Sequence, residues 1–467
     1  EGVSGHLIYV GRGELEDFDG KDVVGSIVLM DYTSGSNWIN AAKLGARAVI
    51  FIEPPAVPHY LDSLKKFIDA PLNFPRLYVT SDAGEKLKGA AEKGGRVTVF
   101  VKMRYIEATA YNVIGSLNGT NSADPTTMIF TARFDSWSAV PALSPGAMEA
   151  IPPALLLELA RYYSENKPYW NVWFVFFSGH WQGLAGPRNF VDNFYFSRDV
   201  AEGRFRPILM IGIGDLDPYG TGLDLLRGSA LNLYATTGNA GGITVRYSWI
   251  RRQIFTSYIH DEDFVSNLQR MTGIKSDSFV KEFFTNTMYW GSQQYPSMLD
   301  TEPAEQTRGI AFTIQSSQTS LSWIGTPVSD LSLVDLGRLR PQLYTIAHII
   351  DSFLNEKSLG INWQSVSPSR LFIQPGGFAE YAGFIELRGK VITYNASVGW
   401  YKPVPKLLVR VYVGFTPTAS VVYGPGGGTA VGGGLSAGYW PLPYPFNKMM
   451  TFADENGVFT IKGLVPY

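Results

Sequence analysis

Residues 171–177 read NVWFVFF, and residues 178–186 continue as SGHWQGLAG. An unbroken apolar run of this length is typical of a strand whose two faces are both covered, as in the centre of a parallel sheet. We therefore expect residues 171–177 to form a central, parallel strand, and the rest of the chain is interpreted outward from it.

Similar apolar runs flank this strand at residues 127–132, 207–213 and 309–315. Between them, Pro152 and Pro153 are expected to open a helix over residues 154–163, since proline is tolerated in the first turn. Residues 330–354 predict a long closing helix. Strands that alternate with helices predict an α/β fold, with a mostly parallel sheet and helices on both faces, over residues 108–357.

The segment before this domain, residues 1–107, is predicted to be a smaller α/β or β-rich domain. Its pattern predicts a helix over residues 37–44 and strands at residues 25–32, 46–52, 74–79 and 96–102.

After residue 365 the composition shifts to β-branched and aromatic residues broken by glycine and proline. Alternation predicts antiparallel strands at residues 383–394, 406–412 and 457–462. Asn456-Gly457 favours positive backbone dihedrals and predicts a hairpin. We expect residues 365–467 to form an all-β sandwich that is incomplete in this sequence.

Bulk composition excludes several classes of function. A chain of 467 residues is too long for one compact core, so we expect two to four domains. The net charge of −2 and the lack of a lysine or arginine run argue against a nucleic-acid partner. No apolar stretch is long enough to cross a membrane. Without cysteine, disulfides and thiolate metal sites are excluded.

Two N-glycosylation sequons favour an extracellular or cell-surface protein. They begin at Asn118 and Asn395, and the first stands at the turn-forming Gly119. We expect N-glycans at these two positions.

The middle domain resembles the two-metal zinc exopeptidases of the secreted aminopeptidase and glutamate carboxypeptidase kind. The resemblance covers some 80 residues in order and spacing. The matching segments are 111–115 (YNVIG), 134–136 (FDS), 146–147 (GA), 155–160 (LLLELA), 176–179 (FFSG), 182–186 (QGLAG) and 190–191 (FV).

The flanking segments also resemble known modules. Residues 9–11 (YVG), 23–29 (VVGSIVL), Trp38, 41–42 (AA) and 45–46 (GA) are similar to the protease-associated domain. Residues 452–459 (FADENGVF) and 403–405 (PVP) resemble the carboxypeptidase regulatory-like β-sandwich.

The resemblance to zinc exopeptidases implies a site of two zinc ions, held by histidines and carboxylates, with a glutamate as general base. Arg133 stands where the family has its first histidine ligand, two residues before Asp135, and Glu149 stands at the bridging aspartate. The adjacent glutamates, one the base and one a ligand, correspond to His180 and Trp181. Asp215 or Asp217 corresponds to the family's next carboxylate ligand. The family's final histidine is expected after Asp300, where this chain has Thr301.

These replacements predict that the metal site has been lost. A guanidinium has no lone pair to donate, and tryptophan is not a ligand. Buried carboxylates left without a metal need another partner. Because Arg133 and Asp135 are two apart and face the same side of a strand, we predict that Arg133 pairs with Asp135, Glu149 or Asp215.

Plainer interpretations stay open at this stage. Arg133 can be a surface residue without a partner, Asp135 an ordinary strand-end residue, and His180 a satisfied, partly buried imidazole. The set of Asp135, Glu149, His180 and Asp215 can also be interpreted as a site for some other cation.

The leading functional hypothesis is a non-catalytic extracellular binding or assembly protein, as the resemblance to degenerate relatives such as nicastrin and the transferrin receptor implies. No cofactor is then expected. We expect protein partners or self-assembly through aromatic surface patches, as in a surface layer or filament. Aromatic-rich segments such as residues 169–173 and 440–446 are interpreted as core or interface rather than as ligand cages. The alternative is an active secreted exopeptidase that binds zinc in a rearranged site.

Overall fold

The structure is a computed structural model of the chain, in which two compact units can be distinguished. Unit 1 comprises Glu1–Ile106, Ser136–Met148 and Ser320–Leu333, and unit 2 comprises Glu107–Asp135, Glu149–Thr319 and Val334–Tyr467. The domain boundaries expected near residues 107 and 365 stay predictions. The residues that the structure describes are 2–55, 62–63, 65–66, 73–102, 108–138, 140–218, 222–226, 253–274, 284–285, 299–305, 307, 309–317, 325–326, 329–369, 371–373, 379–381, 385–412 and 448–464.

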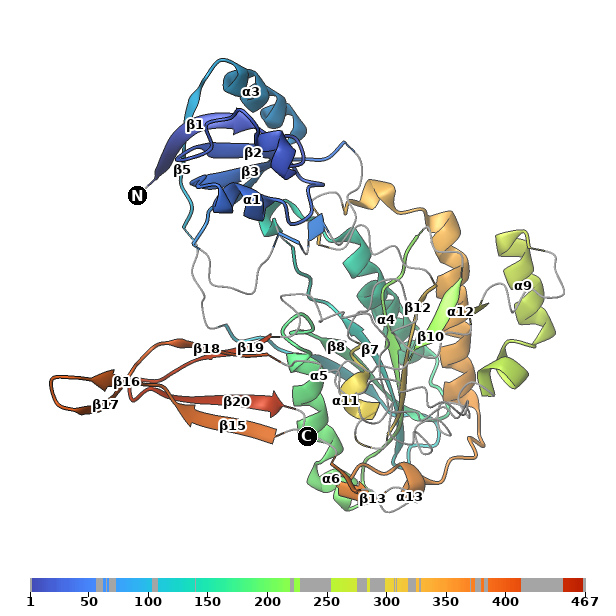
Figure 1. Ribbon diagram of the computed structural model, residues 1–467. Coiled ribbons are helices and arrows are strands. Elements are labelled where there is room, and N and C mark those ends of the chain that lie inside the picture. The colour runs from blue at the N-terminus through green and yellow to red at the C-terminus, as the bar shows by residue number, and fades with distance from the viewer. Residues whose placement is uncertain are drawn as a thin grey trace, which may run out of the picture. The chain divides into compact units, whose positions relative to one another are not determined.

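Unit 1 contains a five-stranded sheet in the order β4-β3-β2-β1-β5 (Figure 1). Strands β1 to β4 are parallel, and β5 runs antiparallel to β1. The expected strands at residues 25–32, 46–52, 74–79 and 96–102 are confirmed as parts of this sheet. Their bounds are β1 Val3–Tyr9, β2 Ile27–Asp31, β3 Ala48–Ile52, β4 Arg76–Val79 and β5 Arg96–Val99.

Alternation along β2 and β3 sends apolar side chains to both faces of this sheet. One face packs around Trp38 of α1 (Trp38–Lys43), and the other packs against α3 (Ser81–Glu92). The helix expected over residues 37–44 is thus confirmed as α1. The described part of unit 1 also includes the short 3-10 turns η1 Leu15–Phe18, η2 Pro141–Leu143 and η6 Leu331–Leu333.

Unit 2 is built on a seven-stranded mixed sheet in the order β11-β10-β12-β9-β7-β8-β6. Its four middle strands, β12, β9, β7 and β8, are parallel to one another, as the apolar runs predict. Strand β8 coincides with the predicted residues 171–177, but it lies one strand from the edge, because β6 pairs with it antiparallel. The bounds are β6 Val113–Leu117, β7 Thr126–Arg133, β8 Asn171–Phe177, β9 Arg206–Ile213, β10 Leu223–Leu226, β11 Phe284–Thr285 and β12 Ile310–Ser316.

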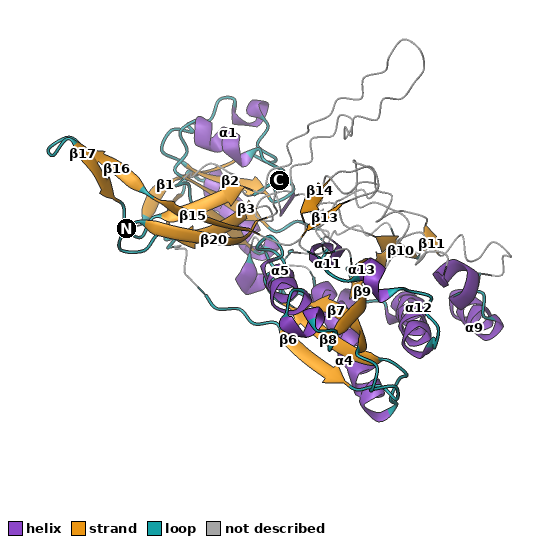
Figure 2. Ribbon diagram, turned by 90° about the horizontal axis from the view of Figure 1, so that it is seen from below, coloured by secondary structure: helices purple, strands orange, loops and turns teal. Residues whose placement is uncertain are grey.

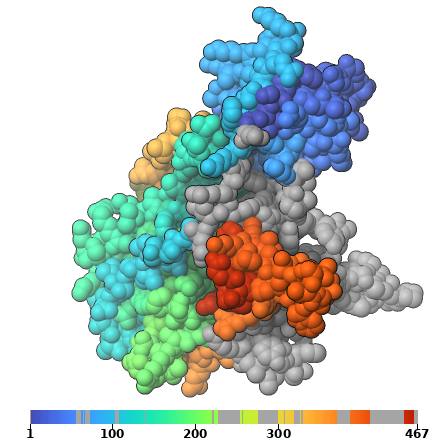
Figure 3. Space-filling view, turned by 90° about the vertical axis from the view of Figure 1, so that its left-hand side faces the viewer, coloured from blue at the N-terminus to red at the C-terminus, as the bar shows by residue number. Residues whose placement is uncertain are grey.

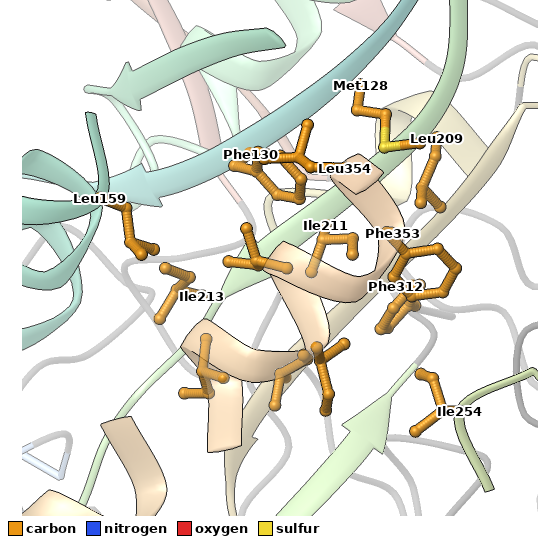
Figure 4. Packing of buried hydrophobic residues seen from close by; sticks show 14 of the residues in the cluster. Met128, Phe130, Leu159, Leu209, Ile211, Ile213, Ile254, Phe312, Phe353 and Leu354 are labelled. Carbon is orange, nitrogen blue, oxygen red and sulfur yellow. The ribbon is translucent and has the colours of Figure 1, made fainter. Parts of the chain in front are cut away.

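Helices cover both faces of the unit 2 sheet, as Figures 1 and 2 show. Helices α4 (Ala147–Glu165), α9 (Glu262–Thr272) and α12 (Leu336–Asn355) contribute to the larger core, part of which appears in Figure 4. The opposite face packs on α5 (Ala185–Phe190). The remaining helical turns are η3 Val191–Tyr195, α6 Arg198–Ala201, η4 Ile254–Tyr258, α11 Glu302–Glu305 and α13 Trp363–Val366.

The prediction that Pro152 and Pro153 open a helix is wrong. Helix α4 begins at Ala147, so both prolines lie inside it. Ala147 and Met148 are buried at 4% and 2% exposure, and their burial favours an additional first turn. Because proline has no backbone N–H, each of the two prolines removes one possible hydrogen bond from the helix backbone.

The C-terminal strands of unit 2 form four two-stranded antiparallel ladders. A turn at residues 454–457 is present, and the Gly457 N–H donates to the Asp454 carbonyl at 3.0 Å. The predicted hairpin is nevertheless wrong, because the two strands at this turn belong to different ladders. The ladders pair β13 Leu371–Ile373 with β14 Ala379–Tyr381, β15 Ile385–Lys390 with β20 Val458–Leu464, β16 Ile392–Asn395 with β17 Trp400–Pro403, and β18 Leu408–Tyr412 with β19 Lys448–Phe452.

Within the described part of the chain, no helix has the length and apolar character needed to cross a membrane.

Candidate functional site

The candidate site lies at the carboxyl ends of the parallel strands β7, β8 and β9. Arg133 is the last residue of β7, His180 follows β8, and Asp215 follows β9. Parallel strands bring their carboxyl ends to the same edge of a sheet, where open α/β sheets commonly place their sites. Three of the positions singled out in the sequence therefore lie on one edge.

Arg133 forms a buried ion pair with Asp215 through its Nη2 atom. The two side chains are only 5% and 4% exposed, which excludes a surface arginine without a partner. Asp215 is one of the three partners that the sequence predicts. The alternative residue, Asp217, is buried too, and its backbone N–H donates to Ser316 Oγ at 2.7 Å.

The surroundings of Arg133 stabilise its positive charge. Burial alone lowers the pKa of Arg133, but the nearby carboxylates of Asp215, Asp300, Asp135 and Glu149 more than offset this, and the pKa is raised overall. The guanidinium carbon also lies 4.9 Å from the centre of the Trp181 ring, within range of a cation–π contact. The cation is therefore permanent at any ordinary pH.

Asp135 does not pair directly with Arg133, because β7 ends at Arg133 and Asp135 lies beyond the strand. Its Oδ2 atom instead accepts a hydrogen bond from the His180 backbone N–H at 3.0 Å. Burial raises the pKa of Asp135. His180 and Arg133 lower it, Asp300 raises it, and the balance lies above the usual value.

His180 is fully buried, at 1% exposure, so the expectation of a partly buried imidazole is wrong. Its Nδ1 atom lies 2.8 Å from Asp300 Oδ1. The other ring nitrogen, Nε2, has no hydrogen-bond partner among the described residues, so the imidazole is not fully satisfied by them. The loop after β8 folds His180 inward because neighbouring Gly179 and Gly183 adopt positive φ angles.

The same loop contains a strained residue. Leu184 has φ = 59° and ψ = 37°, in the left-handed region that side-chain-bearing residues rarely adopt. It is completely buried, and its backbone N–H donates to the His180 carbonyl at 2.9 Å. Leucine packing and this hydrogen bond hold the loop in a conformation that fixes His180 and Trp181.

Two further predicted positions lie in buried surroundings. Glu149, in the first turn of α4, is 4% exposed and acts electrostatically on Arg133. Thr301 is completely buried, and its hydroxyl lies 2.9 Å from that of Thr313 on β12. The Thr301 hydroxyl is thus engaged by the sheet.

The donor set does not fit a two-zinc centre. Arg133 and Trp181 offer no lone pair, and Thr301 has a neutral hydroxyl bonded to Thr313. Among the residues that the structure describes, no three His, Asp or Glu side chains form a group that could hold a metal ion. What the site does hold is a guanidinium among carboxylates.

Sequence reasoning missed two members of the cluster. Asp300 was used only as a landmark before Thr301, and Gln315 at the end of β12 was not considered. Both line the same small cavity as Arg133 and His180. The sequence could have indicated these two residues only through their positions, since each lies at or near an end of a core strand or helix.

Other candidates resolve as structural features. Asp261 caps α9 and accepts a hydrogen bond from the Phe264 N–H at 2.8 Å. Trp170, within residues 169–173, is buried at 8% exposure, which makes it a core residue. Asn118 is exposed, and Asn395 ends β16. Residues 440–446 lie outside the described residues.

The sequence matches no protein-family model and no curated protein in these comparisons. In structure the chain is similar to a zinc aminopeptidase from Bacillus subtilis, at 17% identity and a TM-score of 0.43, over 79% of this chain and 78% of that one. It is also similar to the gamma-secretase component nicastrin, at 13% identity and a TM-score of 0.47, over 78% and 74%. A peptidase M28 precursor from Shewanella amazonensis is similar at 14% identity and a TM-score of 0.41, over 76% and 75%.

Proposed function

We propose that this chain is a non-catalytic extracellular or cell-surface protein that binds or assembles with other proteins, built on a metallo-aminopeptidase-like scaffold whose metal site has been lost. The observation that carries the proposal is the buried ion pair between Arg133 and Asp215. In this interpretation the guanidinium supplies, from within the chain, the positive charge that bound metal would supply in a working peptidase.

Electrostatics support this interpretation. Arg133 stays charged at any ordinary pH and cannot donate an electron pair to zinc. A divalent ion that entered the cluster would compete with Arg133 for the carboxylates and would lie beside a buried positive charge. Zinc binding would therefore require the guanidinium to leave a site in which it is only 5% exposed.

The extracellular setting and the assembly role are supported by surface features. The β16–β17 ladder exposes Tyr394, Trp400 and Tyr401 at 58%, 71% and 54%. Residues of these C-terminal strands appear in orange on the face shown in Figure 3. Exposed aromatic side chains of this kind are enriched at protein–protein interfaces. Asn118 and Asn395 supply the sequons for N-glycans, and a fall in mass on treatment with an N-glycosidase would test them.

The flanking modules fit the same role. The protease-associated resemblance of unit 1 and the β-sandwich resemblance of the C-terminal strands both belong to modules that contribute surfaces rather than chemistry. We include both in the proposal. A crystal structure of the whole chain, compared with known members of each module, would test them.

The competing function, a secreted metal-dependent exopeptidase, is tested by activity. The purified chain is refolded with zinc or with manganese and assayed on aminoacyl anilides, with the Bacillus subtilis zinc aminopeptidase as the positive control. We expect no turnover above the metal-only blank. Turnover that a chelator abolishes and zinc restores would overturn the proposal.

The assembly role is tested separately by electron microscopy of the native material. Ordered sheets, filaments or a defined complex with another protein support it. If the native material contains only monomeric particles, with no second protein bound to them, the assembly role is contradicted.

A further inference from the structure

A small cavity lies within the buried cluster of unit 2. Its volume is about 10 Å³, and its polar lining includes Arg133, His180, Asp300, Thr313 and Gln315. A cavity of roughly this size is at the lower limit for one water molecule and is too small for a peptide or an amino acid. Any ligand of this cavity is therefore no larger than a water molecule or a single ion.

Three nitrogen atoms of the lining residues lack a partner. Arg133 Nε, His180 Nε2 and Gln315 Nε2 are buried and make no hydrogen bond to any residue that the structure describes. The three residues are 4%, 1% and 1% exposed. An unsatisfied buried polar group costs about 1–3 kcal/mol, so three around one cavity indicate a ligand that bonds to all of them.

The other ends of two of these side chains are already fixed. Arg133 is held through Nη2 by Asp215, and His180 is held through Nδ1 by Asp300 at 2.8 Å. In the neutral tautomer whose Nδ1–H donates a hydrogen bond to Asp300, the Nε2 atom of His180 presents a lone pair. The residues that line the cavity thus offer unpartnered N–H donors on Arg133 and Gln315 and, in this tautomer, one nitrogen acceptor on His180.

The combination of hydrogen-bond donors with one acceptor determines which kind of ligand fits the cavity. A cation is disfavoured because Arg133 and Gln315 present N–H groups rather than lone pairs. An anion is disfavoured because Asp300 lines the cavity and Asp135, Asp215 and Glu149 also surround Arg133. A neutral ligand that both donates and accepts satisfies all three nitrogens.

We propose that this cavity is a binding site for one internal water molecule, which accepts hydrogen bonds from Arg133 Nε and Gln315 Nε2 and donates one to His180 Nε2. Three bonds of this kind are typical of a buried water. The Asp300–His180 pair resembles a general base with its water, but a cavity of this size admits no substrate. The water therefore completes the polar core and does not attack a bond.

The inference rests on the proposed function, because a metal ion in the cluster would displace both the guanidinium and the water. A high-resolution crystal structure of the whole chain tests it, with separate soaks in bromide and in zinc. We expect a single peak at about 2.7–3.2 Å from the three nitrogens, without anomalous signal in either soak. An anomalous bromide peak overturns the water in favour of an anion site and leaves the proposed function standing. A zinc peak overturns both, and an empty cavity overturns the water alone.

A solution experiment uses a conservative pair of variants. Gln315→Met removes one donor to the water, whereas Gln182→Met changes an exposed glutamine of the loop after β8. Oxygen-17 relaxation dispersion counts the long-lived internal waters of each protein. We expect Gln315→Met to lose one such water relative to the wild type and Gln182→Met to lose none. An unchanged count in a folded Gln315→Met protein contradicts the assignment, and if this variant does not fold, the crystal soaks decide.

Discussion

Both units of the molecule bury cationic side chains, and two of these, Lys66 and Arg133, meet opposite electrostatic surroundings. Lys66 in unit 1 is 5% exposed and donates to the Gly35 carbonyl at 2.8 Å and to Ser34 Oγ at 3.3 Å. Its Nζ atom also lies over the rings of Tyr32 and Phe51, at 5.0 and 4.6 Å. Within the described residues, no carboxylate oxygen lies within ion-pair distance of it. Arg133 in unit 2 is paired with Asp215 and surrounded by further carboxylates.

The pKa values follow this difference. Burial lowers the pKa of Lys66 to about 7, and the charge of Asp62 only partly opposes it. The carboxylates around Arg133 raise its pKa despite complete burial. A buried cation thus keeps its charge where carboxylates surround it and tends to lose its proton where they do not. This is why we regard Arg133 as a permanent ion of the site and Lys66 as a titrating group.

The largest expected effect is that of Arg133→Met. It leaves Asp215 and its neighbours as buried, uncompensated negative charges, a change that typically costs about 3–5 kcal/mol. Urea unfolding, followed by tryptophan fluorescence, measures the loss. The double variant Arg133→Met with Asp215→Leu should recover part of it. If the single and double variants lose the same free energy of unfolding, the uncompensated charge of Asp215 is not the cause of the loss.

The next effect is that of Lys66→Met, with exposed Lys65→Met as its matched control. The folded state lowers the pKa of Lys66 from 10.5 to about 7, so between these values the unfolded chain binds more protons. The free energy of unfolding of the wild type therefore rises with pH from 7 toward 9, and the full cost of the buried charge is present below pH 7.

Lys66→Met should remove this rise and add roughly 2 kcal/mol of stability at pH 6, after allowance for lost cation–π contacts. Thermal unfolding at a series of pH values measures both. A rise that persists unchanged in Lys66→Met, or an identical loss of slope in Lys65→Met, would refute the assignment.

A smaller effect is expected for Asp300→Asn. The amide oxygen can still accept from His180 Nδ1, but the hydrogen bond loses its charged partner, which corresponds to about 1 kcal/mol. Asp199→Asn, an exposed carboxylate paired with Arg204, is the control and should change stability by less. Urea midpoints compare the two, and a greater loss in the control would contradict the role of Asp300.

The smallest effect is expected for Arg204→Met. Arg204 and its partner Asp199 are 56% and 59% exposed, and an exposed ion pair contributes about 0–1 kcal/mol. The same urea titration as for Arg133→Met gives the contrast directly. If the two arginine variants lose similar amounts of stability, burial does not determine how much the Arg133–Asp215 ion pair contributes to the free energy of unfolding.

The sequence predicted those parts of the fold in which a local pattern determines structure. The apolar run at residues 171–177 matches β8 residue for residue, because a strand in the interior of a sheet needs continuous apolar character. The start of α4 was missed, because burial of Ala147 and Met148 extends the helix beyond what proline position suggests.

In the site, the sequence predicted that Arg133 is paired but not which of three carboxylates is the partner. That choice depends on β7 ending at Arg133, which takes Asp135 away from the guanidinium and toward the His180 backbone. The Asp300–His180 contact joins residues 120 positions apart. Lys66 likewise lies over the rings of Tyr32, which follows β2, and of Phe51 in β3. Contacts of this kind arise only from tertiary packing, so no local pattern indicates them.

The guanidinium of Arg133 is the cation of the unit 2 cluster, and the proposed loss of the metal site depends on it. Equilibrium dialysis of the whole chain against zinc, with the bound metal counted by mass spectrometry, tests this directly. We predict no stoichiometric zinc in the wild-type protein. Two zinc ions for each chain, retained through gel filtration, would contradict the account and restore the exopeptidase hypothesis.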